Sequence, residues 1–436
     1  MMDRLIRRAA SLVVAVLAIL SLRLAGGAGD VQPAQAPASG PPGRFTFALY
    51  GDSRAGDNCS DNADHLHLIG RIVDDNPALV LHLGDMVTGY KATTNWIQRG
   101  DCAHAASNGS LKEIIAPLMA PAPEGLPTRY FPVLGNHDDN WDDGWYPDAS
   151  KNGVCDLFGA TTIRALVPNH TAQSYFRDKT GRNYPIRSDD EFYRRLCSTS
   201  NATRDVFPAF FYYSFDYRGS HFVVMRINSD YYDVRAGNGP CTAASENNYD
   251  TCYNVHQLHW LQADLARAKA NPNTKHIFAF LHAPVFTSGD DHPASSSWPS
   301  ISKEFSKAKA DVVFAGHDHV YERTVPIYAT IDNPDGVRDD ERGTVYVITG
   351  GGGSPLTGFL PKPAWFDVVR EATKHYVRVT VDADQVSVEA IAIDGKSLDK
   401  FAVRQHLNRT SPPRKAFHTR YKRPHTGRAD IGHRKR

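Results

Sequence analysis

The chain has 436 residues, enough for one large domain or two ordinary ones. Its 49 basic and 48 acidic side chains give a net charge of +1, so no overall electric field attracts nucleic acid or a membrane. Hydrophobic residues make up 41% and charged residues 22% of the chain. This composition excludes a mostly disordered protein, predicts a globular one with a sizeable core, and implies no nucleic-acid partner.

The first 28 residues have the pattern of a targeting segment. Arg4, Arg7 and Arg8 precede an apolar run from Ala9 to Leu22. A bilayer-spanning helix needs about 20 apolar residues, so this run is short for one. It favours a signal peptide over residues 1–28, with a short membrane anchor as the alternative. We therefore expect an exported protein, secreted or periplasmic.

Two further segments differ in composition from the middle of the chain. Residues 29–43 are rich in proline, alanine and glycine, which predicts a flexible linker. Residues 403–436 carry many lysines and arginines against a single acid, Asp430, which predicts a disordered basic tail. Such a tail either stays solvated with no partner or adheres to an anionic envelope or cell surface.

Six cysteines are present, and none has the CxxC spacing typical of a metal site. In an oxidising compartment an even number of cysteines favours disulfides. We expect three local pairs: Cys59 with Cys102, Cys155 with Cys197, and Cys241 with Cys252.

Between residues 44 and 402 strand, turn and helix patterns alternate, which predicts one α/β domain. In the first half, strands are expected at Arg44–Tyr50, Ala78–Leu83 and Tyr130–Leu134, with an amphipathic helix at Ala63–Asp74. In the second half the expected elements are a hairpin (Phe210–Tyr217 and His221–Asn228), a helix (Gln257–Ala270), three strands (Lys275–Leu281, Asp311–Ala315 and Thr344–Thr349) and a closing hairpin (Tyr376–Val381 and Gln385–Ile391).

Residues from about 140 to 209 interrupt this alternation. They include many aromatic residues but little continuous strand or helix pattern. A long irregular stretch in a compact domain is often a lid or a substrate-shaping insertion. The alternative is a loop packed on the flank and held by Cys155 and Cys197.

Polar residues able to bind metal follow the expected strands, most of them directly after a glycine. They are Asp52, Asp85, Asn136, His137, His282, His317 and His319. The carboxyl ends of parallel strands share one edge of a sheet, where α/β proteins place ligands. Oxygen and imidazole donors without thiolate suit Fe, Mn or Zn, and their number exceeds what one tetrahedral ion needs. The sequence therefore predicts two metal ions at this edge.

The order Gly51-Asp52, Gly84-Asp85, Gly135-Asn136-His137-Asp138, His282 and Gly316-His317-Asp318-His319 resembles the calcineurin-like metallophosphoesterase superfamily. The stretch from Gly316 to Arg323 is similar to its purple acid phosphatase branch. This resemblance implies an α/β fold with four layers, α-β-β-α, and a two-metal site. It further implies that Asp52 and His319 bind one ion, that Asn136, His282 and His317 bind the other, and that Asp85 bridges them.

By the same resemblance, His137 contacts the substrate phosphate and acts as general acid, with Asp138 a candidate to orient it. The chain departs from the family at two positions. Arg54 replaces a histidine common in the superfamily, and it could meet a substrate phosphate bidentately. Thr88 replaces the metal-binding tyrosine of purple acid phosphatases, so Tyr90, His65 or solvent is left to complete the first ion.

These features predict a phosphoesterase in which a metal-bridging hydroxide hydrolyses small phosphate monoesters, as in acid phosphatases. A phosphodiesterase or nucleotidase with the same site is the nearest alternative. A non-catalytic envelope-binding protein that keeps the fold is the alternative of another class. Of the remaining histidines, His82 is expected to be a core strand residue, and His292 is a candidate to face the substrate.

Overall fold

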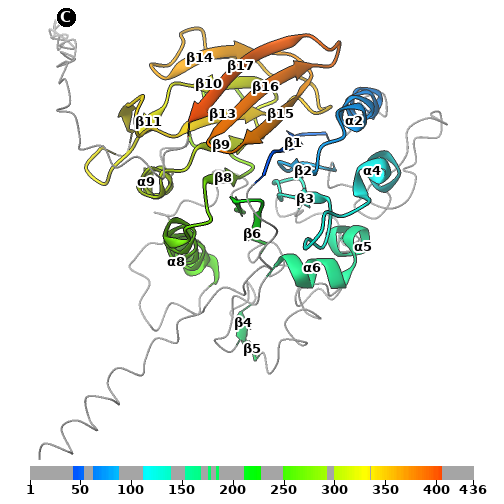
Figure 1. The fold of residues 1–436 in the computed structure, drawn as a ribbon, viewed down its shortest axis with the longest axis horizontal. Coiled ribbons are helices and arrows are strands. Elements are labelled where there is room, and N and C mark those ends of the chain that lie inside the picture. The colour runs from blue at the N-terminus through cyan, green and yellow to red at the C-terminus, as the bar shows by residue number, and fades with distance from the viewer. Residues whose placement is uncertain are drawn as a thin grey trace, which may run out of the picture.

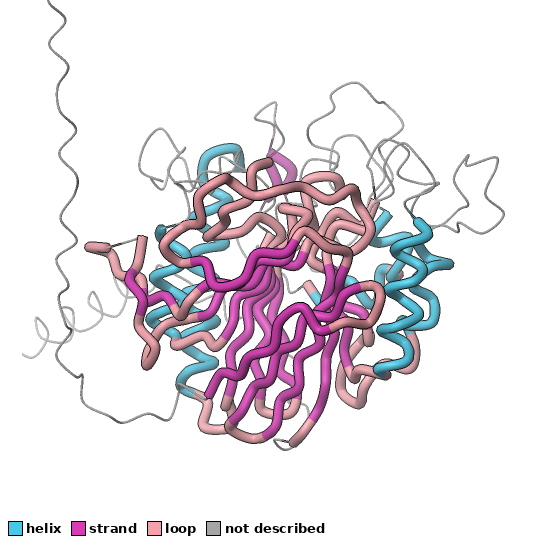
Figure 2. Tube along the Cα trace, turned by 90° about the horizontal axis from the view of Figure 1, so that it is seen from above, coloured by secondary structure: helices cyan, strands magenta, loops and turns pink. Residues whose placement is uncertain are grey.

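The computed structural model describes residues 43–53, 62–87, 111–138, 153–167, 175–177, 183–185, 211–226, 249–291, 299–333 and 335–404. Within these ranges two large β-sheets lie face to face (Figure 1), and helices cover both outer sides (Figure 2). The α/β fold with two sheets between helices is therefore confirmed.

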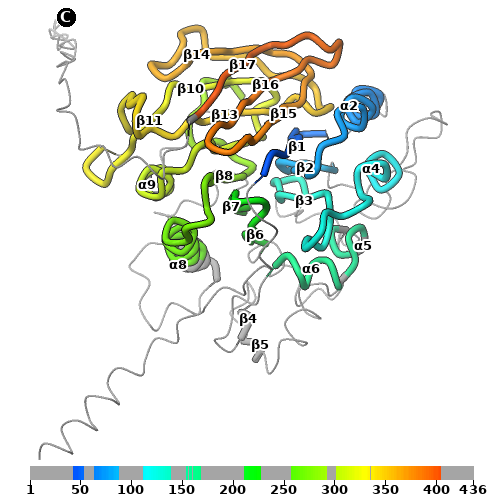
Figure 3. Tube along the Cα trace, viewed as in Figure 1, coloured from blue at the N-terminus to red at the C-terminus, as the bar shows by residue number. Residues whose placement is uncertain are grey.

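The first sheet has six strands in the order β17-β16-β15-β1-β2-β3. Strands β1, β2 and β3 are parallel, and β15 pairs antiparallel with β1 although the two are far apart in the chain (Figure 3). The bounds are Phe45–Tyr50 for β1, Leu79–His82 for β2, Tyr130–Pro132 for β3, His375–Asp382 for β15, Gln385–Ala392 for β16 and Ser397–Arg404 for β17.

The second sheet has seven strands in the order β14-β10-β13-β9-β8-β7-β6. Its central strands β13, β9, β8 and β7 are parallel. The bounds are Asp367–Glu371 for β14, Tyr321–Thr324 for β10, Val345–Thr349 for β13, Val312–Ala315 for β9, His276–Phe280 for β8, Ser220–Val224 for β7 and Tyr213–Tyr217 for β6. Two small hairpins are formed by β4 (Tyr175–Arg177) with β5 (Asn183–Pro185) and by β11 (Ile327–Tyr328) with β12 (Val337–Arg338).

Aromatic side chains fill the space between the two sheets. Phe47 of β1 meets Phe278 of β8 with ring centroids 5.3 Å apart and Phe222 of β7 at 5.4 Å. Along β8, Phe278 and Phe280 point into this inner core, whereas Ile277 and Ala279 belong to a second core under the helices. A strand buried on both faces needs a continuous apolar run, which explains the composition of β8.

Helices cover the outer faces of the sheets. On the side of the first sheet lie α2 (Asn62–Asp75) and α4 (Leu111–Met119), and on the side of the second lie α8 (Tyr249–Ala270) and α9 (Pro299–Ala308) (Figure 1). Leu68, Ile69 and Ile72 form the buried face of α2, as its amphipathic spacing predicts. Among the described residues no helix is both long and apolar enough to cross a membrane.

The region from about 140 to 209 is less irregular than the sequence suggests. It contains α5 (Gly153–Phe158), α6 (Ala160–Leu166) and the β4–β5 hairpin. Val154, Phe158 and Ile163 of the two helices are buried and belong to the same hydrophobic cluster as the strands of the first sheet. The expectation of little regular structure was therefore wrong for these residues.

Several predicted features fall outside the described residues. They are the signal peptide at 1–28, nearly all of the 29–43 linker, and the tail beyond Arg404. Strand β17 pairs with β16 up to Arg404, two residues past the expected domain end. Cys155 is disulfide-bonded, but no other cysteine side chain is described, so the three pairings stay predictions.

Candidate metal centre

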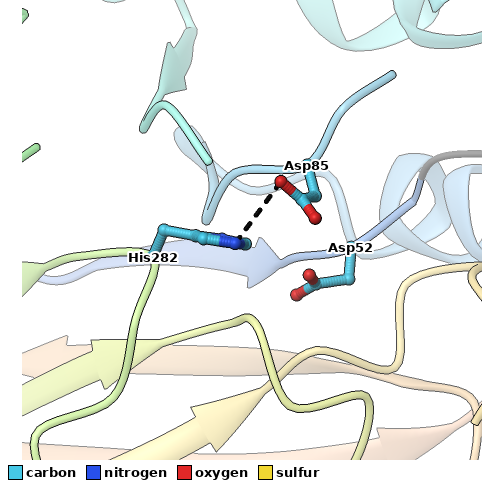
Figure 4. A group of neighbouring side chains, drawn as sticks. All are labelled: Asp52, Asp85 and His282. Atoms are coloured by element: carbon cyan, nitrogen blue, oxygen red, sulfur yellow. Dashed lines mark ion pairs between the residues drawn. The ribbon is translucent and has the colours of Figure 1, made fainter. Parts of the chain in front are cut away.

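The parallel pairing of strands brings the predicted ligands to one edge of each sheet. Asp52 follows β1, Asp85 follows β2, and Asn136 follows β3 in the first sheet. His282 follows β8 and His317 follows β9 in the second. Figure 4 shows Asp52, Asp85 and His282 pointing toward one another, and one ligand atom of each lies within 4.8 Å of the others.

Three of these residues share an unusual backbone conformation. Asp52, Asp85 and His317 each follow a glycine and have φ angles of 59°, 55° and 72°. A residue other than glycine in this left-handed region costs on the order of 1–3 kcal/mol, and such residues cluster at functional sites. Hydrogen bonds hold the conformation, because Asp52 N donates to Gly84 O at 2.9 Å and His317 N donates to Asp52 Oδ2 at 2.8 Å.

Glycines let the loops approach closely enough for this arrangement. A Cβ atom on Gly135 would lie 2.2 Å from Asp85 Oδ1, and one on Gly316 would lie 2.5 Å from Asp52 Oδ2. A Cβ on Gly350, in the glycine run after β13, would lie 2.8 Å from the same Asp52 oxygen. Real Cβ atoms do not come this close to other atoms, so these positions need glycine.

Electron-rich atoms converge around His282. Its Nδ1 lies 2.8 Å from the backbone oxygen of Leu83, so Nδ1 carries the proton and Nε2 has a lone pair. Three atoms surround His282 Nε2: Asn136 Oδ1 at 3.0 Å, His317 Nδ1 at 3.1 Å and Asp85 Oδ1 at 3.4 Å. Two imidazole nitrogens, an amide oxygen and a carboxylate oxygen thus converge within hydrogen-bonding distance or little more, and this set of donor atoms fits a metal ion.

The other half of the centre contains Asp52 and His319. His319 Nδ1 donates to the backbone oxygen of Pro355 at 2.5 Å, which leaves Nε2 as the nitrogen that can coordinate. His319 Nε2 lies 3.5 Å from Asp52 Oδ1, and that oxygen is buried and accepts no hydrogen bond from the described residues. A carboxylate oxygen and an imidazole nitrogen in this arrangement fit a second ion. The six predicted ligands thus lie together, and their coordination of metal stays a prediction.

His137 lies at the edge of the centre. Its backbone N donates to Asp85 Oδ1 at 2.9 Å, and its Nε2 lies 3.9 Å from Asp85 Oδ2. Its side chain is 23% exposed, whereas that of Asp85 is 1% exposed. His137 is therefore placed to reach both the ligands and a group arriving from solvent.

Asp138 makes a set of contacts that the sequence did not indicate. Its carboxylate accepts hydrogen bonds from four backbone N–H groups, those of Asp85, Met86, Val87 and Gly135, at 2.8 to 3.3 Å. These contacts connect two loops. We predicted that Asp138 orients the His137 ring, whereas these four contacts are with backbone N–H groups.

Two histidines near the centre make other contacts. His82 accepts a hydrogen bond from Gly84 N at Nδ1 (3.2 Å) and therefore donates from Nε2 to Ser53 Oγ (2.8 Å). Burial holds its pKa well below the usual value. His65 bonds Tyr50 Oη through Nε2 at 3.1 Å, and burial lowers its pKa to about 3. Arg54, Thr88, Tyr90 and His292 lie outside the described residues.

Sequence patterns also missed a buried group of carboxyls behind the centre. Thr287 Oγ1 donates to Asp318 Oδ2 at 2.5 Å, and Ser288 N donates to both oxygens of Glu322 at 3.1 and 3.0 Å. Burial and a hydrogen bond with Asp367 raise the pKa of Glu322 to about 9. Only the position of Glu322, three residues after His319, could have pointed to this group.

Known proteins with a similar sequence or fold support one family. The family described as calcineurin-like phosphoesterase matches residues 29–321, more than half of the chain. Purple acid phosphatase 21 of Arabidopsis thaliana is 30% identical over 145 residues, which are 33% of this chain and 27% of that protein. A second Arabidopsis thaliana protein, named probable inactive purple acid phosphatase 27, is 39% identical over 85 residues, 19% of this chain and 14% of that protein. The matched segments thus span about a quarter or less of these relatives.

The fold has a counterpart among solved structures. The purple acid phosphatase PPD1 from yellow lupin (Lupinus luteus) seeds superposes with a TM-score of 0.53 and 19% sequence identity. The match covers 85% of this chain and 55% of the lupin chain, which supports the fold. Because the family match spans all the expected motifs up to Gly316-His317-Asp318-His319, the chain belongs to the calcineurin-like phosphoesterase family, near its purple acid phosphatase branch.

Proposed function

We propose that the protein is an exported, binuclear metal-dependent phosphoesterase that hydrolyses small phosphate monoesters. The observation that carries the proposal is the convergence of His282 Nε2, Asn136 Oδ1 and Asp85 Oδ1 on one point. The family implies a centre of two metal ions, and the donor set fits Fe, Mn or Zn.

The residues divide between the two ions as follows. Asp52 and His319 hold one ion, Asn136, His282 and His317 hold the other, and Asp85 is shared. Two bound ions supply Lewis-acid chemistry and lower the pKa of water at the site. The hydrogen bonds from His282 to Leu83 O and from His319 to Pro355 O fix both rings and leave Nε2 as the nitrogen directed at the ion.

His137 acts on the substrate from the partly exposed edge of the centre. In its protonated form it donates a hydrogen bond to a phosphate oxygen and passes a proton to the leaving oxygen as the P–O bond breaks. The carboxylate of Asp85 lies 3.9 Å from His137 Nε2. Arg54 is proposed to bind the same phosphate.

A turnover assay with two substrates tests the proposal. The full chain, loaded in turn with Mn, Fe or Zn, is assayed on an aryl phosphate and an aryl phosphodiester. We expect turnover of the monoester and its loss in His317→Ala. His276→Gln is the matched control, because His276 is a buried histidine at the opposite end of β8 from His282.

Each other outcome supports a different function. Faster turnover of the diester favours a phosphodiesterase. The name of the relative at 39% identity, probable inactive purple acid phosphatase 27, favours keeping a non-catalytic function as the second candidate. No turnover of either substrate by protein that holds both metals would favour that candidate, a binding protein of the cell envelope. An active His317→Ala variant would refute the assigned site.

Export and the terminal segments belong to the same proposal. Residues 1–28 act as a signal peptide, 29–43 as a linker and the basic residues after 404 as a tail that contacts anionic surfaces. Deleting residues 1–28 should leave the protein in the cytoplasm. Deleting the tail should weaken retention on anionic cell-envelope material in a salt-dependent way, and unchanged retention would contradict its role.

A further inference from the structure

We propose that Asp138 is a positioning residue that holds together the two loops carrying Asp85, Asn136 and His137. Its Oδ2 accepts from Asp85 N and Gly135 N, each at 2.8 Å. Its Oδ1 accepts from Met86 N at 2.9 Å and Val87 N at 3.3 Å. One side chain therefore binds the loop after β2 and the loop after β3 at once. The inference rests on the proposed function only in treating Asp85 and Asn136 as metal ligands.

The number of these bonds limits which further hydrogen bonds the Asp138 carboxylate can accept. An ionised carboxylate is an acceptor only, with about four lone-pair sites. Four backbone N–H groups occupy that capacity. A hydrogen bond from the His137 ring would need a further site. The carboxylate thus acts on His137 through the backbone of its loop.

The loop after β2 depends on such an acceptor. Asp85 has a φ of 55°, and the three consecutive N–H groups of Asp85, Met86 and Val87 all point to Asp138. Successive N–H groups around a left-handed residue form a concave site that takes an anion. Here the anion comes from the chain itself, and it stabilises the conformation that directs Asp85 into the centre.

The two loops also bind in the opposite direction. Asp85 Oδ1 accepts from His137 N at 2.9 Å, while Asp138 Oδ2 accepts from Asp85 N. The loop after β2 therefore gives three N–H groups to Asp138, and the loop after β3 gives one to Asp85. Gly135 permits this contact, because a Cβ there would lie 2.4 Å from Asp85 N. Loss of an acceptor oxygen at Asp138 should loosen both loops while the strands that carry them stay formed.

The substitution Asp138→Asn tests the proposal, because an amide keeps the size and replaces one acceptor oxygen with a donor. We expect hydrogen exchange at Asp85, Met86, Val87 and Gly135 to accelerate in the metal-free full chain. We also expect the affinity for at least one metal ion to fall about 10- to 100-fold. Saturating metal should restore most of kcat, and the pH profile of kcat should keep its shape.

A matched control is Asp311→Asn. Asp311 is fully buried at the start of β9, and its Oδ2 accepts one backbone N–H, from Ile277 at 2.9 Å. This variant should change overall stability without changing metal affinity. If Asp138→Asn fails to fold, Asp138→Glu, which keeps the charge but displaces the oxygens, provides the same two measurements.

Two results would overturn the inference. One is unchanged exchange at the four amides in Asp138→Asn, together with unchanged metal affinity. The other is a shifted pH profile of kcat that saturating metal does not restore, which would assign Asp138 to proton transfer through His137. Failure of the proposed function gives a different result, since wild-type protein would then turn over no phosphate ester while the amide exchange still reports on Asp138.

Discussion

Asp52 Oδ2 accepts the backbone N–H of His317, 2.8 Å away, so a predicted ligand of one ion holds the backbone of a predicted ligand of the other. Asp52 Oδ1 meanwhile lies 3.5 Å from His319 Nε2. The two oxygens therefore have different partners: one holds the His317 loop, and the other faces His319 Nε2 and the predicted ion. Substitutions at residue 52 can separate these two contacts.

We expect Asp52→Asn to keep the bond to His317 N through its amide oxygen and to lose the negative charge. Loss of a residue that only orients a metal ligand lowers metal affinity about 10- to 100-fold. Asp52 is a predicted ligand itself, so affinity for the ion assigned to Asp52 and His319 should fall at least that much. Asp52→Ala should also release the His317 loop and weaken both ions. Titration with metal, followed by measurement of bound metal per chain, checks both. Equal effects of the two substitutions would contradict the separation.

His137→Asn tests general acid catalysis. Removing a positioned proton donor lowers the rate about 10²- to 10⁴-fold. The loss should be large for a phenyl phosphate, whose leaving oxygen needs a proton, and much smaller for a dinitrophenyl phosphate, whose leaving oxygen does not. Bound metal should stay the same, because His137 is not a predicted ligand. A loss that is equal for both substrates would assign His137 to phosphate binding alone.

Two glycine substitutions should have opposite effects. Gly135→Ala places a Cβ 2.2 Å from Asp85 Oδ1 and should abolish metal binding at the shared ligand. Gly70→Ala lies on the exposed side of α2 with no atom within 4 Å of the new Cβ, so it should stabilise the protein by about 0.5–1 kcal/mol. Metal content and urea unfolding measure the two effects. Normal metal binding by Gly135→Ala would show that the loops can separate.

Stability should fall at alkaline pH because of His221. Burial alone lowers the pKa of this β7 histidine, but Asp264 (2.8 Å) and Asp216 (2.7 Å) raise it to about 9. A pKa higher in the folded than in the unfolded state stabilises the protein below about pH 6.5, and this stabilisation is lost as pH rises through 9. The shift corresponds to roughly 3 kcal/mol.

Urea unfolding of the chelator-treated protein at pH 6 and pH 9.5 measures this loss. His221→Gln should be less stable than wild type at pH 6 and should show a smaller decrease between the two pH values. The metal centre does not contribute, since the chelator removes its ions. If both proteins lose the same stability, other groups cause the decrease.

The sequence predicted the elements that carry the site better than it predicted the rest of the fold. Strands β1, β2, β8 and β9 are short apolar runs that end before a glycine or a histidine, and burial on both faces makes such runs easy to identify. The helix expected at Ala63–Asp74 is α2, extended by one residue at each end. The helix was predictable from its apolar spacing, and the strands from their short length, their β-branched and aromatic residues and the turns that follow them.

One edge strand of each sheet, β17 in the first and β14 in the second, was not predicted. β14 has only partly buried or exposed residues. The pairing of β17 with β16 shifts its register between Ala390 and Ile391 of β16, so β17 has no regular apolar alternation. Edge strands pack on fewer neighbours and so carry a weaker apolar pattern. In the site, the ligand types followed from motifs, but the contacts of Asp138 depend on two loops meeting, which no local pattern encodes.

The bond between Asp52 and His317 joins residues 265 positions apart in the chain. At a synthesis rate of about 5–20 residues per second, the ribosome makes His317 roughly 10 to 50 s after Asp52. During that time the left-handed backbone at Asp52 lacks one of the partners that hold it. The full set of predicted ligands therefore exists only once the chain has been made through His319, and we expect metal to bind after that point.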